Sequence, residues 1–212
     1  MICKCSVNNV TIQPPGGFAG ASILYTFDNT PDDYYGNYNA SPLNNPEFIS
    51  PGYNGRGSAV QLFRNRSQCF SVPNHMNFYN KSFTMEAWIY PSINALTVYD
   101  AIIYLQINAS LAGQAMYTSL RYGRFIGAFM FIDAYGLTIF KPNQWQHLAF
   151  TSNFSTRTQT VYLNGVIGKG NIKGKTSILR PTLFFFARCH KYKCRSLSSY
   201  TWKTTYRLSF GY

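Results

Sequence analysis

Charged residues are scarce in this sequence, and acidic residues are the scarcest. Only 12% of the 212 residues are charged, about half the usual share of roughly 25%. All seven acidic residues lie within residues 1–133, where seven basic residues balance them. The other twelve basic residues follow with no acid among them. This asymmetry indicates either a polyanion-binding surface or an atypical C-terminal tail.

The sequence also lacks long hydrophobic runs. The longest apolar patch near its end, residues 183–187, is far shorter than the roughly 20 residues that cross a bilayer. The N-terminal residues 1–5 show no basic segment followed by an apolar one, so no signal peptide is recognisable. We therefore expect no membrane span, and an extracellular location would require the chain to be a fragment of a longer protein.

Cysteine is present in an odd number, so five thiols cannot all pair within the chain. Their pairing stays open. Cys189 and Cys194 flank His190 and resemble half of a zinc site, but no second half follows. We therefore predict no zinc. The cysteines are Cys3, Cys5, Cys69, Cys189 and Cys194.

Long runs with helical periodicity are missing as well, whereas aromatic residues reach 17%. Residues 82–90 alternate strictly, with Phe83, Met85, Ala87 and Ile89 on one face. Short runs of this kind recur along the chain and predict an all-β sandwich or barrel. The expected strands are residues 22–27, 58–63, 68–72, 82–90, 100–107, 119–122, 124–132, 136–140, 145–152 and 159–163.

A hairpin is predicted where residues 159–163 are followed by Asn164-Gly165 and then Val166-Ile167. Asparagine and glycine tolerate the positive φ angles that a tight type I′ turn requires. The chain should therefore reverse at this dipeptide and return as a paired strand.

Five segments in this order resemble the laminin-G-like, concanavalin A-like jelly roll of the LamG/pentraxin superfamily. The segments are SILYTFDNT, PEFISPGYNGRGSAVQLFRN, SFTMEAWIYP, NQWQHLAFTSN and TVYLNGVIGKG, within residues 20–170. The resemblance implies a two-sheet antiparallel jelly-roll sandwich whose inward faces share one core. The expected core residues include Phe83, Ala87, Ile89, Trp145, Phe150 and Leu163.

The resemblance ends after about residue 169, because the acidic closing strand typical of the family is missing. We expect residues 1–21 to be a linker or leader remnant and residues 22–180 to form the jelly-roll domain. Residues 181–212 would be an atypical basic tail that either completes or replaces the closing strands.

Catalysis is not expected. Glycosidases that share this broad fold need two carboxylates beside the scissile bond, whereas the best candidate strand carries only Glu86. His147 is more readily explained as a structural residue than as a base. We therefore predict no enzyme, no catalytic residues and no cofactor.

A weak candidate calcium site lies near the first strand. Relatives of the fold often hold Ca²⁺ at the sandwich rim through oxygen ligands, and Asp28, Asn29, Asp32 and Asp33 could supply them. The loops near the closing strand lack acids, so a complete site is doubtful, and a solvated loop is the simpler interpretation.

Six Asn-x-Ser/Thr triplets are candidate N-glycosylation sites and favour a secreted glycoprotein. They begin at Asn9, Asn39, Asn65, Asn80, Asn108 and Asn153.

Together these features predict a non-catalytic extracellular recognition or adhesion module whose ligand is a glycan or a glycoprotein. Loop tyrosines could contact such a ligand, but they also occur in aromatic-rich domains that bind nothing. The alternatives are a structural spacer in a larger surface protein, or a heparin-like polyanion binder acting through the basic C-terminal segment. Binding of nucleic acid is not expected. The loop tyrosines are Tyr34, Tyr35, Tyr38, Tyr53 and Tyr99.

Overall fold

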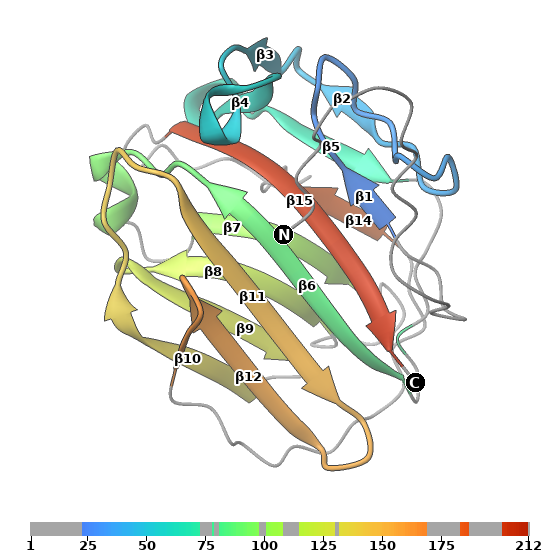
Figure 1. Ribbon diagram of the computed structural model, residues 1–212, viewed down its shortest axis with the longest axis vertical. Helices are drawn as coiled ribbons and strands as arrows, with labels where there is room; N and C mark the ends of the chain where they lie inside the picture. Colours follow the sequence, from blue (N-terminus) through green and yellow to red (C-terminus); the bar gives the residue numbers. More distant parts are fainter. Residues whose placement is uncertain are drawn as a thin grey trace.

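Two antiparallel β-sheets face each other in the computed structural model, which confirms the predicted all-β jelly-roll sandwich (Figure 1). The structure describes residues 23–72, 78, 81–97, 101–107, 115–129, 132–168, 183–186 and 201–211. The only helical elements in this part of the chain are three short 3₁₀ turns: η1 (Tyr53–Gly55), η2 (Arg64–Arg66) and η3 (Ile93–Leu96). No helix among the described residues is long and apolar enough to span a membrane.

The first sheet has eight strands, and its long central strands are β11, β6 and β15 (Figure 1). A short strand, β1 (Ile23–Tyr25), also pairs with β15. The order along the sheet is β13 (Val166–Ile167), β12 (Thr158–Leu163), β11 (Gln146–Asn153), β6 (Ser82–Ile89), β15 (Thr201–Gly211), β4 (Ala59–Phe63) and β3 (Glu47–Ile49).

The second sheet has seven strands and lies behind the first in the view of Figure 1. Its order is β10 (Ile132–Ile139), β9 (Arg124–Phe129), β8 (Ala115–Arg121), β7 (Ala101–Ile107), β14 (Leu183–Phe186), β5 (Cys69–Val72) and β2 (Ser41–Leu43).

The predicted hairpin at Asn164-Gly165 is confirmed. Both residues have positive φ, 50° and 78°, and Leu163 of β12 pairs with Val166 of β13. The Asn164 side chain also accepts a hydrogen bond from the backbone N–H of His147 at 2.8 Å. The turn is therefore tied to the neighbouring strand β11 as well as to its own two strands.

The core between the sheets contains five of the six residues expected there, and they are at most 5% exposed. They are Phe83, Ala87, Ile89, Phe150 and Leu163. Where Phe150 of β11 meets the opposite sheet, the facing residue is Gly127 of β9. A Cβ atom at Gly127 would lie 2.3 Å from the Phe150 ring, so the two sheets approach closely at this point.

The prediction that Trp145 belongs to the core is wrong, because its side chain is partly exposed and lies outside the buried cluster. The physical reason is the two-residue period of a strand. Strand β11 begins at Gln146, which is buried together with Leu148 and Phe150. Trp145 differs from Phe150 by an odd number of residues and so falls on the opposite face.

The segment after residue 180 contributes one strand to each sheet. Strand β15 pairs with β6 from Thr204 to Gly211 and with β4 from Thr201 to Thr204, and β14 joins β5 to β7. The expected linker over residues 1–21 lies outside the described residues, as does most of the chain between residues 169 and 200. The predicted domain boundaries at residues 22 and 180 stay predictions.

Candidate functional site

Strands β6 and β11 carry large side chains on the sheet face that points away from the core. On β6 the odd-numbered residues from Phe83 to Ile89 are buried, whereas Trp88 and the following Tyr90 are partly exposed. Trp88 lies directly opposite His147 of β11 in the sheet register. The alternation of each strand therefore brings Trp88 and His147 together on the outer face.

Five rings meet on this face, and we call them the aromatic cluster: Tyr53, Trp88, Tyr90, Trp145 and His147. The ring of Tyr53, from η1, stacks on Trp88 with centroids 3.7 Å apart and planes at 23°. Trp145 meets Tyr53 and Tyr90 edge-on at 5.8 and 5.7 Å. The His147 ring lies 5.0 Å from Trp88. All five side chains are partly exposed.

Flat aromatic surfaces that remain partly open to solvent are typical of binding sites. Each ring offers a large apolar face at small entropic cost, and Tyr and Trp add a polar hydrogen-bonding group at the ring edge. The aromatic cluster can therefore pack against an apolar ligand face while it hydrogen-bonds to polar groups at the rim. It is the candidate functional site of the chain.

His147 presents a neutral imidazole in this cluster at pH 7. Partial burial lowers its pKa below the ordinary value of 6.5, and the negative charge of Glu86 opposes this shift only in part. The ring packs on Trp88 in the sheet register, as a structural histidine would.

The two residues opposite Glu86 in the sheet register carry no carboxylate. They are Ala149 on β11 and Arg207 on β15. Asp133 lies on the other sheet, where Arg121 binds it at 2.8 Å. Asp100 lies outside the described residues. Neither Glu86 nor Asp133 therefore faces a second carboxylate in the register of its sheet.

The residues considered for calcium bind backbone N–H groups. Asp33 is 3% exposed, and its carboxylate accepts hydrogen bonds from the N–H groups of Leu24, Asn37 and Tyr38 at 2.9–3.2 Å. Oδ1 of Asp28 accepts from the N–H of Ser58 at 3.0 Å. These carboxylates anchor loops.

The remaining two candidates, Asn29 and Asp32, also make hydrogen bonds to neighbouring residues. The N–H of Asn29 donates to the Ser58 hydroxyl, and Asp32 accepts a hydrogen bond from Thr30 at 2.6 Å. No group of three or more His, Cys, Asp or Glu side chains suited to a metal occurs among the described residues. Calcium binding at the four candidate residues stays a prediction.

Three of the six candidate glycosylation sites fall in the described part of the chain, and all three are exposed. Asn39 accepts a hydrogen bond from the N–H of Asp33, and Asn153 accepts one from Thr156. Asn65 lies in η2. Asn9, Asn80 and Asn108 lie outside the described residues, and glycosylation stays a prediction.

Among the loop tyrosines, only Tyr53 belongs to the aromatic cluster. Tyr34 is 59% exposed and meets Tyr35 edge-on at 5.4 Å, Tyr38 packs against the core, and Tyr99 lies outside the described residues. The sequence analysis missed Trp88, Tyr90 and Trp145 as site residues. The available signal was that Trp88 and Tyr90 share the outward face of residues 82–90.

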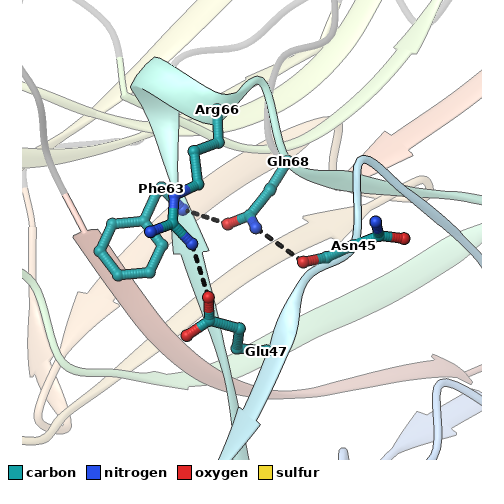
Figure 2. A network of polar contacts seen from close by, with 5 residues as sticks. All are labelled: Asn45, Glu47, Phe63, Arg66 and Gln68. Carbon is teal, nitrogen blue, oxygen red and sulfur yellow. Dashed lines mark hydrogen bonds and ion pairs between the residues drawn. The ribbon is translucent and has the colours of Figure 1, made fainter.

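The turn η2 is held by a polar network at the edge of the sandwich (Figure 2). Gln68 is 4% exposed, accepts a hydrogen bond from the N–H of Phe63, and donates one to the carbonyl of Asn45. Arg66 lies over the Phe63 ring and pairs with Glu47. Because Arg66 and Glu47 are about half exposed, their ion pair should contribute little to stability.

The outer face of the seven-stranded sheet has a different character. Tyr117 and Arg121 of β8 both hydrogen-bond to the carboxylate of Asp133 on β10, at 3.0 and 2.8 Å. Burial raises the pKa of Tyr117 to about 12. On the same face Ser119 and Ala128 are fully buried, Tyr117, Arg121 and Asp133 are partly exposed, and Tyr135 and Ile139 of β10 are exposed.

Comparisons with known proteins give a family and a fold. A family model described as the concanavalin A-like lectin/glucanases superfamily matches residues 64–185. No curated protein matches the chain.

Solved structures of botulinum neurotoxin binding domains are similar to the chain. The serotype C1 binding domain has a TM-score of 0.68 at 13% identity, over 88% of this chain and 47% of its own. The serotype DC binding domain in complex with rat synaptotagmin II has a TM-score of 0.65 at 14% identity, over 88% of this chain and 47% of its own. The DC domain in complex with SialylT has a TM-score of 0.65 at 13% identity, over 88% of this chain and 46% of its own. The chain thus spans less than half the length of these proteins, and the likeness shows the fold.

Proposed function

The chain belongs to the concanavalin A-like lectin/glucanase superfamily, and on this premise we propose that it is a non-catalytic recognition module at an extracellular surface. Its ligand is a glycan or a glycoprotein. The observation that carries the proposal is the aromatic cluster, in which Tyr53, Trp88 and Trp145 lie partly exposed on an outer sheet face. A rigid aromatic surface of this kind is typical of recognition sites.

The similar solved structures support a binding role. They are binding domains, and two of them were solved with bound partners, SialylT in one case and synaptotagmin II in the other. Those partners belong to the neurotoxins. For this chain they support only the general classes of ligand, a glycan or a protein.

The absence of catalysis is supported by the placement of the described acids. Hydrolysis of a glycosidic bond uses two carboxyl groups, about 5 Å apart in retaining enzymes and farther apart in inverting ones. Glu86 is flanked in the register by Ala149 and Arg207, and Asp133 is paired with Arg121. In the sheet register, the residues opposite these two acids carry no carboxylate.

A printed glycan array and a screen for glycoside hydrolysis test the proposal together. We expect the chain to bind a limited set of glycans and to release no sugar from any of them. The variant Trp88→Ala should lose the array signal. Turnover of any glycoside would overthrow the non-catalytic assignment. A blank array for the unaltered chain would favour the structural spacer.

Polyanion binding is the second candidate function, favoured by the twelve basic residues that follow Asp133. Deleting residues 181–212 would not test it, since β14 and β15 would be lost with them. The informative variant replaces Arg188, Lys191, Lys193 and Arg195 with glutamine. Loss of heparin retention with an unchanged circular dichroism spectrum would support this function, and unchanged retention would reject it.

A further inference from the structure

Tyr53 belongs to no strand of the sandwich. It lies in η1, within the loop of residues 50–58 that joins β3 to β4. Inside the loop, the N–H of Gly52 donates to the carbonyl of Gly57, and the Ser50 hydroxyl donates to the same carbonyl. These bonds shape the loop, but none of them fixes it over the sheet.

The loop is fixed at its end by Asp28 and Ser58. Ser58 is 5% exposed, and its N–H donates to Oδ1 of Asp28 at 3.0 Å. The Ser58 hydroxyl accepts from the N–H of Asn29 at 2.7 Å and donates to the carbonyl of Phe27 at 2.8 Å. We call this set of bonds between residues 27–29 and Ser58 the clasp.

Two glycines allow the clasp to close. A Cβ atom at Gly52 would lie 2.5 Å from the carbonyl oxygen of Ser58, and one at Gly57 would lie 2.9 Å from Oδ1 of Asp28. Gly57 also has a φ of +58°, which glycine adopts without strain. Gly52 therefore lies closer to the Ser58 carbonyl, and Gly57 closer to the Asp28 carboxylate, than a residue with a side chain could.

The backbone on either side of Asp28 lies in the left-handed region. Phe27 and Asn29 have φ values of 51° and 60°, and the left-handed region is unusual for a bulky residue such as phenylalanine. The Phe27 ring is buried against Tyr25 and Phe70. This packing holds the residue in place while the Asp28 carboxylate faces Ser58. Strain retained at one position is often linked to a functional arrangement nearby.

We propose that Asp28 is a positioning residue of the candidate site: through the clasp it holds the 50–58 loop so that the Tyr53 ring stacks on Trp88. Asp28 itself does not touch the ligand. The proposal rests on the proposed function for its biological meaning, because it explains how one ring of the aromatic cluster is preorganised. Preorganisation raises affinity by removing the cost of ordering the loop on binding.

The test is a set of substitutions at Asp28 with a readout of the ring stack. Stacking at 3.7 Å places the Trp88 indole protons in the ring current of Tyr53, so their NMR shifts report the stack directly. Asp28→Ala should move these signals toward their positions in Tyr53→Ala. Asp28→Asn keeps the acceptor oxygen and should leave them in place. Asp32→Ala is the matched control, because the Asp32 carboxylate bonds to Thr30 rather than to the loop.

A double variant separates positioning from a general loss of structure. In the Tyr53→Ala background, Asp28→Ala should produce no further shift of the Trp88 signals. On the printed glycan array, Asp28→Ala should bind about fivefold more weakly than the unaltered chain, as expected when an ordered loop becomes mobile.

Unchanged Trp88 signals in Asp28→Ala would overturn the proposal, and so would an equal shift in Asp32→Ala. The proposed function is tested by the array, independently of the NMR signals. A blank array with the Trp88 signals displaced would leave the positioning role intact. Unchanged Trp88 signals together with strong array binding that Trp88→Ala abolishes would reject the positioning role alone.

Discussion

The two outer faces of the sandwich differ in the contacts that their side chains make. On the eight-stranded sheet, β6 and β11 present partly exposed rings together with a neutral His147. On the seven-stranded sheet, β8 and β10 join Tyr117, Arg121 and Asp133 in a polar network beside fully buried Ser119 and Ala128. The first face carries aromatic rings in mutual contact, whereas on the second the charged groups of Arg121 and Asp133 bind each other within their own sheet.

The two sheets share the two-residue alternation of their strands but differ in the residues that point outward. Both sheets direct apolar residues inward, and the chemistry of the outward residues decides the role of each face. Aromatic rings keep apolar area in contact with water, and such area indicates a binding surface when it is clustered. An ion pair whose side chains are only 19% and 15% exposed instead has its hydrogen-bonding groups committed within the fold.

The largest expected effect comes from the point where both sheets touch. Gly127→Val places side-chain atoms where a Cβ alone would lie 2.3 Å from the Phe150 ring, so the core should be overpacked by about 3 kcal/mol. Both faces would then be disturbed together. Urea unfolding monitored by circular dichroism measures the loss. Adding Phe150→Leu should recover part of it, and a Gly127→Val variant as stable as the unaltered chain would contradict the close approach of the sheets.

The next effect is confined to the seven-stranded sheet. Asp133→Ala leaves the guanidinium of Arg121 without its carboxylate at a mostly buried position, so we expect a loss of about 2 kcal/mol of unfolding free energy. Glu47→Ala is the comparison. Glu47 and Arg66 are about half exposed, so loss of their ion pair should lower the unfolding free energy by no more than about 0.5 kcal/mol. Chemical denaturation of both variants measures the difference. Equal losses would show that the polar network does not hold this sheet.

A smaller effect on stability, but a large one on binding, is expected on the aromatic face. Trp88→Ala should weaken binding to array glycans about tenfold or more, with a stability loss of only about 1 kcal/mol from the lost ring contacts. Tyr117→Phe, on the other face, should leave the array signal unchanged. The comparison of the two faces would be wrong if Tyr117→Phe reduced binding as much as Trp88→Ala.

The smallest effect is the pH dependence contributed by His147. Its pKa is lowered in the folded chain, so below about pH 6.5 the unfolded chain binds the proton more readily. The stability that His147 contributes is therefore complete above that pH and is lost as the pH falls through the lowered folded pKa. An NMR titration should show one histidine protonating below pH 6.5, and this signal should vanish in His147→Gln. A His147 midpoint at or above 6.5 would contradict its desolvation by the cluster.

The sequence predicted the parts of the fold that depend on local pattern. Alternation placed Phe83, Ala87 and Ile89 in the core, and Asn164-Gly165 reversed the chain as expected. Strands β2 and β3 were missed because they are only three residues long and lie in a segment rich in proline. A long strand in residues 201–211 could not be assigned with certainty, because its composition departs from the family pattern.

The candidate site could not be predicted because it depends on register and on a loop. Trp88 and His147 are neighbours only because β6 and β11 pair in one particular register. Tyr53 reaches Trp88 only through the fold of residues 50–58. Asp28 and Asp33 were weak calcium candidates from residue type alone, and no linear pattern reveals the backbone hydrogen bonds that their oxygens accept.

The most direct test of the account is an NMR titration of the ¹⁵N-labelled chain with a glycan that binds on the array. We predict that the indole signals of Trp88 and Trp145 shift first and saturate together, while the amide signals of Tyr117, Arg121 and Asp133 stay in place. Shifts confined to Tyr117, Arg121 and Asp133, with both indole signals unmoved, would contradict the assignment of the aromatic cluster as the binding surface.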